Sequence, residues 1–384
     1  MLMERLRLKN ILSFRDATVE LGPLNVLIGP NAVGKSNLIE VIGLLQALPT
    51  SLPMAIFQGG GIRQWLWLGD LLPVQASIEC DFRLGNDQQF GPLSYELEIL
   101  GDSDRYTISW EKLAERGGPK PGIYFERESG DATIFPRTEE SPTTVKLNAG
   151  ESMFSQFKNP ADQTAITATG RDFSKTQIFR EFRTGPLAAL RQGISTNIQK
   201  DRLLDGGDNL AMVLQDLNFH DRHDRVKSYL TRFCGRFTDV KVDIGGGLAR
   251  IYLTEAGLTG KISSSRMSDG TLKFLALLAA LFHPQPPPLM CIEEPELGLH
   301  PDALHIVADA LLEASEKMQL IVTTHSDALI DALTDKPETV LVCERDFDNG
   351  TQMKRLSSKE LKDWLEHYSL GELWRKGEIG GGRW

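Results

Sequence analysis

One short segment restricts the possible folds of this chain more than any other: GPNAVGKS at residues 29–36. It matches G-x-x-x-x-G-K-[ST], a pattern that forms a loop around the phosphates of a nucleotide. The segment before it, LNVLI, is typical of a short strand buried on both faces. After it, Leu38, Ile39, Ile42 and Leu45 are spaced as on one face of a helix. The order strand, glycine loop, helix predicts an α/β fold with a parallel sheet.

This loop also predicts what it binds. Backbone N–H groups of a glycine-rich loop and of a helix N-terminus attract phosphate. Lys35 would neutralise the β- and γ-phosphate oxygens, and the Ser36 hydroxyl would ligate Mg²⁺. ATP and Mg²⁺ are therefore the expected cofactors. The expected nucleotide-binding residues are Gly29, Pro30, Asn31, Ala32, Val33, Gly34, Lys35, Ser36 and Asn37.

A second segment, LMCIEE at residues 289–294, is an apolar strand that ends in two carboxylates. Taken alone, this segment indicates only a buried strand that meets a solvated loop, with no functional role. A phosphate-binding loop needs an acidic strand end beside it, which favours a functional interpretation. Glu293 would hold Mg²⁺, directly or through water, although aspartate is more common there. Glu294 would polarise the attacking water as a general base.

The segment TTHS at residues 323–326 follows the next apolar strand. A single histidine at a strand end is usually only a polar residue. His325 can also reach the γ-phosphate, and the order of the strands favours that role.

The segment SDGT at residues 268–271 opens another expected helix. Ser268 is a natural N-cap, which is a purely structural role. An exposed helix N-terminus with the Ser268 hydroxyl and the Gly270 N–H is also a binding site for an anion.

Composition narrows the class of protein. The chain has 384 residues, of which 41% are hydrophobic, which excludes a disordered chain. Its net charge of −10 argues against a protein whose whole surface wraps nucleic acid but leaves room for a local basic groove. The four cysteines form no CxxC pair, so neither a zinc ribbon nor a disulfide framework is indicated. No apolar run approaches the about 20 residues that span a bilayer. We therefore expect a cytoplasmic protein with no membrane partner.

The chain divides into four expected parts. Residues 1–84 form the N-terminal part of the nucleotide-binding head, with an antiparallel hairpin before the loop, and residues 256–345 form its C-terminal part. Residues 85–255 form an inserted mixed α/β lobe, in which residues 240–253 read as a hairpin around three glycines. Residues 346–384 form a tail with three tryptophans, and packing is the expected role of Trp364.

Residues 151–250, called the middle third below, are the only net-basic part of the chain. Their cations could follow the phosphate backbone of double-stranded DNA, or they could form a solvated face. The candidates are Arg171, Lys175, Arg180, Arg183, Arg191, Lys200 and Arg202, with a second cluster at Arg222, His223, Arg225 and Lys227.

Taken in order, GPNAVGKS, MSDGT, LMCIEEPELGLHP and TTHS resemble an ABC-type ATPase head of the SMC/RecF/OLD class. The resemblance covers residues 1–50 and 260–345 and implies an α/β P-loop ATPase with an antiparallel N-terminal subdomain. It implies hydrolysis of ATP between two protomers, with Ser268 and Gly270 completing the partner's site. It also implies that residues 296–300 contact the partner subunit near the nucleotides.

The resemblance leaves other assignments open. Gln75 is a candidate for the glutamine that such heads place near the metal, or it is only a structural residue. The C-terminal LGELWRKGEIGGGRW resembles the ending of stand-alone bacterial ATPases. Members of that group often occur beside a nuclease-like or TOPRIM-like partner, in what look like phage-defence modules. Too few residues follow His325 for a nuclease domain, so such a partner would supply any cleavage.

Two alternatives differ in class. One is a slow ATPase that serves as a scaffold, sequestering and releasing a toxic partner protein without binding DNA. The other is a P-loop kinase or transferase that acts on a small molecule, against which SDGT and TTHS argue.

Overall fold

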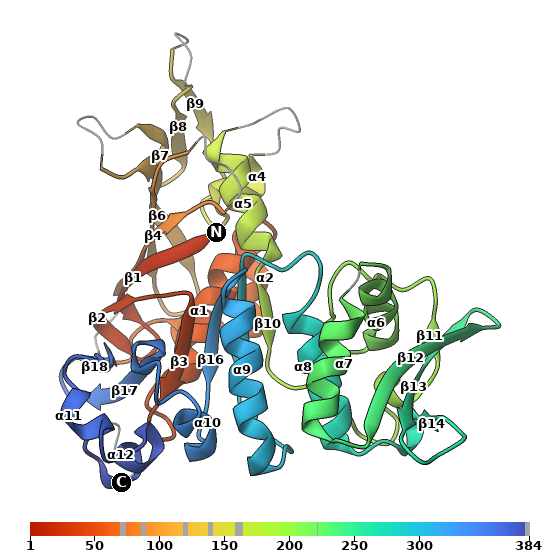
Figure 1. Ribbon diagram of the computed structural model, residues 1–384. Helices are drawn as coiled ribbons and strands as arrows, with labels where there is room; N and C mark the ends of the chain where they lie inside the picture. The colour runs from red at the N-terminus through yellow and green to blue at the C-terminus, as the bar shows by residue number, and fades with distance from the viewer. Residues whose placement is uncertain are drawn as a thin grey trace.

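The computed structural model of the chain describes residues 1–69, 74–85, 90–117, 122–136, 141–157, 164–220 and 222–380. One large mixed sheet runs through it, and a smaller lobe lies beside the sheet (Figure 1). In spatial order, the described strands of the large sheet are β10 (Gln177–Phe179), β15 (Leu289–Glu293), β16 (Gln319–Thr323), β3 (Leu24–Ile28), β17 (Val340–Asp346), β18 (Gly350–Arg355), β2 (Phe14–Glu20), β1 (Leu2–Ile11), β4 (Val74–Arg83), β5 (Leu93–Gly101), β6 (Tyr106–Glu115), β7 (Ile123–Glu128), β8 (Asp131–Ile134) and β9 (Thr143–Lys146).

The first five strands of this order, β10 to β17, are parallel. Their residues are apolar because helices cover both faces. In β3, Leu27 faces the core built with α1 (Lys35–Ala47), and Val26 and Ile28 face the core built with α8 (Asp269–Leu281) and α9 (Leu304–Ser315). The predicted α/β class with a buried strand before the loop is confirmed.

The remaining strands are antiparallel. Their buried faces pack against α1, α2 (Leu52–Gln58), α3 (Ile62–Trp65), α4 (Met153–Gln156) and α5 (Ala165–Lys175). The sheet thus joins a parallel half, where a nucleotide is expected, to a long antiparallel half.

The smaller lobe lies beside α8, on the right of the view in Figure 1. Its sheet contains β11 (Ile194–Ser195), β12 (Phe237–Gly245), β13 (Leu248–Glu255) and β14 (Ile262–Ser263), covered by α6 (Leu210–Phe219) and α7 (His223–Phe233). β12 and β13 form the hairpin predicted around the three glycines.

The range 85–255, expected as one inserted lobe, occupies two places. Strands β5 to β9 extend the large sheet, and β10 forms the end of its parallel half. The separate lobe therefore begins after β10 and continues through β14, which lies beyond residue 255.

The expected tail is part of the head. β18 lies between β17 and β2 and so connects the two halves of the sheet. α10 (Asp327–Asp331), α11 (Lys362–Leu365) and α12 (Leu370–Lys376) follow, and Trp374 is buried in the core. Trp364, expected to pack, is 43% exposed, and Trp384 lies outside the described residues. Among the described helices, none is long and apolar enough to cross a membrane.

Candidate functional site

The glycine loop lies where the C-terminal ends of the parallel strands meet. Gly29 and Gly34 have φ angles of 146° and 104°, which side chains other than glycine rarely allow. A Cβ atom at Gly29 would collide with the Cys343 carbonyl, and one at Gly34 would collide with Thr351 and Ser13. Both glycines are therefore required by the packing around the loop.

Lys35, the first residue of α1, is curled under the loop. Its Nζ donates to the carbonyl oxygens of Gly29, at 2.7 Å, and Pro30, at 2.8 Å. Burial lowers the pKa of this ammonium group, although the nearby carboxylates of Glu294 and Glu296 oppose the shift. Within the described residues, no side chain caps α1, so the N–H groups of its first turn can bind an anion.

Ser36 and Glu293 form a candidate metal site at the end of β15. The Ser36 Oγ donates to Glu293 Oε2 at 3.0 Å. A hydroxyl that donates to a carboxylate keeps its lone pairs for a cation, and both groups are the hard oxygen ligands that Mg²⁺ prefers. The donor set therefore fits Mg²⁺ bound together with phosphate oxygens.

Glu294 lies one residue further on and has an unusual backbone conformation. Its φ is 45°, and its N–H donates to the Thr323 carbonyl at 2.9 Å. The His325 Nε2 is 3.7 Å from Glu294 Oε1, and both side chains are about one-third exposed. Left-handed backbone in a non-glycine residue is typical of functional sites, where it directs a side chain.

Glu296 fixes the segment that carries His325. Its Oε1 accepts from Thr324 Oγ1 at 2.7 Å and from the His325 N–H at 2.8 Å. Burial raises the pKa of this carboxyl, and Oε2 has no hydrogen-bond partner among the described residues. Residues 296–300 were expected to contact a partner subunit, but Glu296 itself turns inward.

Ser268 caps α8. Its Oγ accepts from the Thr271 N–H at 3.1 Å, and Gly270 lies so close to the Gly298 carbonyl that an added Cβ would be 2.7 Å from that oxygen. The Ser268 side chain is exposed, and the neighbouring Asp269 pairs with Arg191 of the lobe. The start of α8 is thus held firmly and remains open to another molecule.

Two residues near the loop carried no recognisable signal in the sequence. Thr351 Oγ1, on β18, lies 2.7 Å from both the Val33 carbonyl and Ser13 Oγ. These hydrogen bonds hold the glycine loop against β18 and the start of β2. Arg180, counted above among the basic residues, contacts Glu293 from the end of β10. Gln75 lies in β4 and donates to Glu98, which is a structural role.

The basic residues of the middle third do not form one continuous row. Arg171 and Lys175 lie on α5, whereas the others lie at the end of β10 or in the lobe. Several form ion pairs with carboxylates: Arg180, Arg183, Arg191 and Lys200. Arg191 also donates to the Met267 carbonyl at 2.7 Å and so braces the turn before α8.

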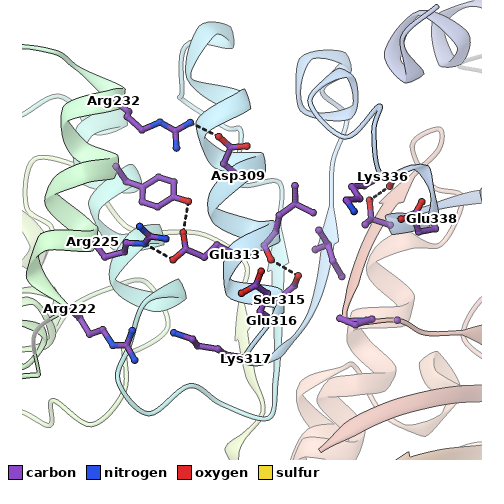
Figure 2. A pocket seen from close by; sticks show the side chains of 16 residues that line it. Arg222, Arg225, Arg232, Asp309, Glu313, Ser315, Glu316, Lys317, Lys336 and Glu338 are labelled. Atoms are coloured by element: carbon purple, nitrogen blue, oxygen red, sulfur yellow. Dashed lines mark hydrogen bonds and ion pairs between the residues drawn. The ribbon is translucent and has the colours of Figure 1, made fainter. Parts of the chain in front are cut away.

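A large cavity lies at the opposite end of the parallel strands. Its volume is about 930 Å³, and its lining includes residues that precede β3, β16 and β17. Figure 2 shows Arg225 and Arg232, from α7, reaching toward Glu313 and Asp309 of α9. These ion pairs join the lobe to the head, away from the glycine loop.

Solved structures share this arrangement. An SmcHead bound to the C-winged helix domain of ScpA has a TM-score of 0.59 at 14% identity, over 94% of this chain and 99% of that chain. The SMC head domain from Thermotoga maritima has a TM-score of 0.52 at 16% identity, over 93% and 100%. An Smc head domain with an extended coiled coil, bound to the C-terminal domain of ScpA derived from Pyrococcus furiosus, has a TM-score of 0.56 at 13% identity, over 95% and 98%. Such likeness shows a shared fold.

A search of curated protein sequences finds no match. A family model described as "AAA domain, putative AbiEii toxin, Type IV TA system" matches residues 24–331, from the strand before the glycine loop to α10. Because that match covers most of the chain, the protein belongs to this family of AAA domains, and its fold is that of an ABC-type ATPase head of the SMC class.

Proposed function

We propose that this protein hydrolyses ATP with Mg²⁺ and dimerises when it binds the nucleotide. One observation carries the proposal: the hydroxyl of Ser36 is hydrogen-bonded to Glu293 beside Glu294 and His325, at the strand end where the glycine loop lies. A phosphate, a divalent cation and a water molecule could all be held there, as phosphoryl transfer requires.

Nucleotide binding follows from the loop. The free N–H groups at the start of α1 and the Lys35 ammonium would bind the β- and γ-phosphates. Ser36 and Glu293 would hold Mg²⁺, which neutralises charge on the phosphate oxygens. Lys35 would exchange the neutral Gly29 and Pro30 carbonyls for charged phosphate oxygens, which bind an ammonium group more strongly.

Hydrolysis needs a water molecule in line with the γ-phosphate. Glu294 would accept a proton from that water, and its left-handed backbone holds the carboxylate at the edge of the site. His325 would contact the γ-phosphate, and the hydrogen bonds from Thr324 and His325 to Glu296 keep the histidine segment in place.

Ser268 and Gly270 would act in the partner's site. The start of α8 is capped, exposed and braced by Arg191, so it presents an ordered helix N-terminus to another surface. A second copy of the chain that brings its own nucleotide to this turn would bury two ATP molecules between the protomers. ATP would then close the dimer, and hydrolysis would open it.

The cycle would act on DNA or control a nuclease-like or TOPRIM-like effector in genome maintenance or phage defence. The family description, with its toxin–antitoxin context, and the SmcHead structures bound to ScpA domains support an effector protein as the partner. The alternative is a slow ATPase scaffold that sequesters a toxic partner without DNA. The ion pairs that occupy several basic residues of the middle third favour this alternative over a DNA groove.

The first experiment is size-exclusion chromatography of Glu294→Gln with saturating ATP and Mg²⁺. The variant should bind ATP without hydrolysing it and elute as a dimer, whereas the same variant without nucleotide elutes as a monomer. Glu316→Gln, an exposed residue of the turn after α9, is the matched control and should behave as the native protein. A Glu294→Gln protein that stays monomeric with bound ATP would contradict nucleotide-driven dimerisation.

The second experiment measures ATP turnover with and without double-stranded DNA at low and physiological salt. Stimulation that fades as salt rises would support contact with the phosphate backbone. Slow ATP turnover that is the same with and without DNA would support the alternative, a scaffold that sequesters a toxic partner.

A further inference from the structure

Arg180 links the candidate metal site to the lobe. It follows directly on β10, the outermost of the parallel strands, which pairs with β15. Its Nη1 lies 2.7 Å from Glu40 Oε1 and 3.1 Å from Glu293 Oε1. One nitrogen therefore holds a carboxylate of α1 and a carboxylate of the metal site at the same time.

The two oxygens of Glu293 have different partners. Oε2 accepts from Ser36, and Oε1 contacts the guanidinium of Arg180. A guanidinium is always charged, so Arg180 supplies the positive charge that Glu293 needs when no metal ion is present. A divalent cation on Glu293 would place a second, larger positive charge beside Arg180, and the two would repel each other.

Glu40 gives Arg180 an alternative position. It lies on α1, and its side chain is about one-third exposed, so it can keep the guanidinium after Glu293 has taken a metal ion. The Arg180 side chain is itself 47% exposed, which leaves it room to move.

The residues around Arg180 join this edge to the lobe. Phe179 and Phe182 are both buried, with ring centroids 5.4 Å apart, in the core that also contains α8 and the lobe residues Leu190 and Leu203. The Arg183 N–H donates to the Gly206 carbonyl at 3.0 Å. A shift of residues 179–183 would therefore change their contacts with the lobe and with α8, whose N-terminus carries Ser268.

We propose that Arg180 competes with the divalent cation for Glu293, so that loading of the nucleotide site frees residues 179–183 from the strand edge and loosens their hold on the lobe. This inference rests on the nucleotide site proposed above. In this proposal Arg180 is a positioning residue, because it acts through the Glu293 carboxylate.

The test uses the full chain with Mn²⁺ as the probe and a non-hydrolysable ATP analogue. Arg180→Gln should tighten Mn²⁺ binding by about tenfold, because the competing charge is gone. Arg183→Gln is the matched control: Arg183 belongs to the same segment but pairs with Asp208, 3.3 Å away, so Mn²⁺ affinity should not change.

A lost charge could tighten Mn²⁺ binding through space alone, so a second readout is needed. Hydrogen exchange of the Arg183 amide should speed up in the native protein when metal and analogue are both added, and should stay slow with analogue alone. In Arg180→Gln the exchange should be fast from the start and independent of metal.

Metal-independent or slower exchange in the native protein would overturn the competition, as would unchanged or weaker Mn²⁺ binding by Arg180→Gln. Failure of the native protein to bind the analogue at all is a separate result, and it would overturn the proposed nucleotide site.

Discussion

The two halves of the large sheet both carry charged side chains, but they surround them differently. In the antiparallel half, Glu111 on β6 and Arg127 on β7 are fully buried. In the parallel half, Glu293, Glu294 and Arg180 lie at the strand ends and are partly exposed.

The number of hydrogen bonds explains the difference. Glu111 accepts from Tyr95, Ser152 and the Met153 N–H at 2.6–2.9 Å and pairs with Arg127, so its carboxylate has no capacity left. The strand-end carboxylates keep free lone pairs that face solvent. A buried charge whose hydrogen bonds are all made is costly to disrupt by removing one partner, whereas a charge with unused lone pairs is available to a ligand.

The largest expected effect comes from breaking the buried pair. Arg127→Met leaves Glu111 buried without its cation and removes the donors to the Asn148 and Glu151 carbonyls. We expect a loss of about 3–5 kcal/mol in the free energy of unfolding, measured by chemical denaturation. Arg105→Met, at an exposed position beside β6, is the control and should cost little. A loss below that of an ordinary surface substitution would show that the pair contributes nothing.

The next effect concerns ligand binding rather than folding. Lys35→Met removes a charged donor from the loop but keeps most of the side-chain volume. Affinity for a fluorescent ATP analogue should fall by about 1.5–3 kcal/mol, the usual contribution of a hydrogen bond to a charged group. Lys336→Met, at an exposed position beyond α10, is the matched control. A large loss of stability with unchanged affinity would assign Lys35 to the structural class of Arg127.

Glu296 lies between these two classes, because it is largely buried but only half satisfied. Its pKa is raised in the folded protein by burial, so the group stabilises the fold below its unfolded pKa and loses that contribution as pH rises through the folded pKa. Glu296→Gln removes the charge and keeps the shape. The variant should gain stability relative to the native protein as pH rises from about 4 to 8, by about 1–2 kcal/mol.

Thermal melting at several pH values checks this, with Glu316→Gln as an exposed control that should show no such trend. A difference between Glu296→Gln and the native protein that stays constant with pH would mean that Glu296 is ionised without cost.

The sequence could predict whatever depends on local spacing. The glycine loop, the cap at Ser268 and the strand that ends at Glu293 each follow from neighbouring residues, and all have the predicted local structure. Arg180 could not be found in this way, because only the pairing of β10 with β15, far apart in the chain, brings it to Glu293. Thr351 depends on similarly distant contacts, with Val33 and Ser13, and the Glu111–Arg127 pair depends on the register between the consecutive strands β6 and β7. A charged residue within a basic stretch looks the same whether it is solvated, buried or part of a site.

The smallest expected effect concerns an exposed ion pair, which we compare with the buried Glu111–Arg127 pair. Arg225, on α7, donates to Glu313 at 2.6 Å, but its side chain is 54% exposed. Water screens this pair, and Glu313 keeps its bond from Tyr229 at 2.9 Å when the arginine is lost. Arg225→Gln should therefore cost only about 0.2–1 kcal/mol in chemical denaturation, and the cost should shrink as salt is added. A loss as large as that of Arg127→Met, or one that salt leaves unchanged, would show that the contact between α7 and α9 is as tightly held as the buried pair, and that exposure does not separate the two kinds of charge.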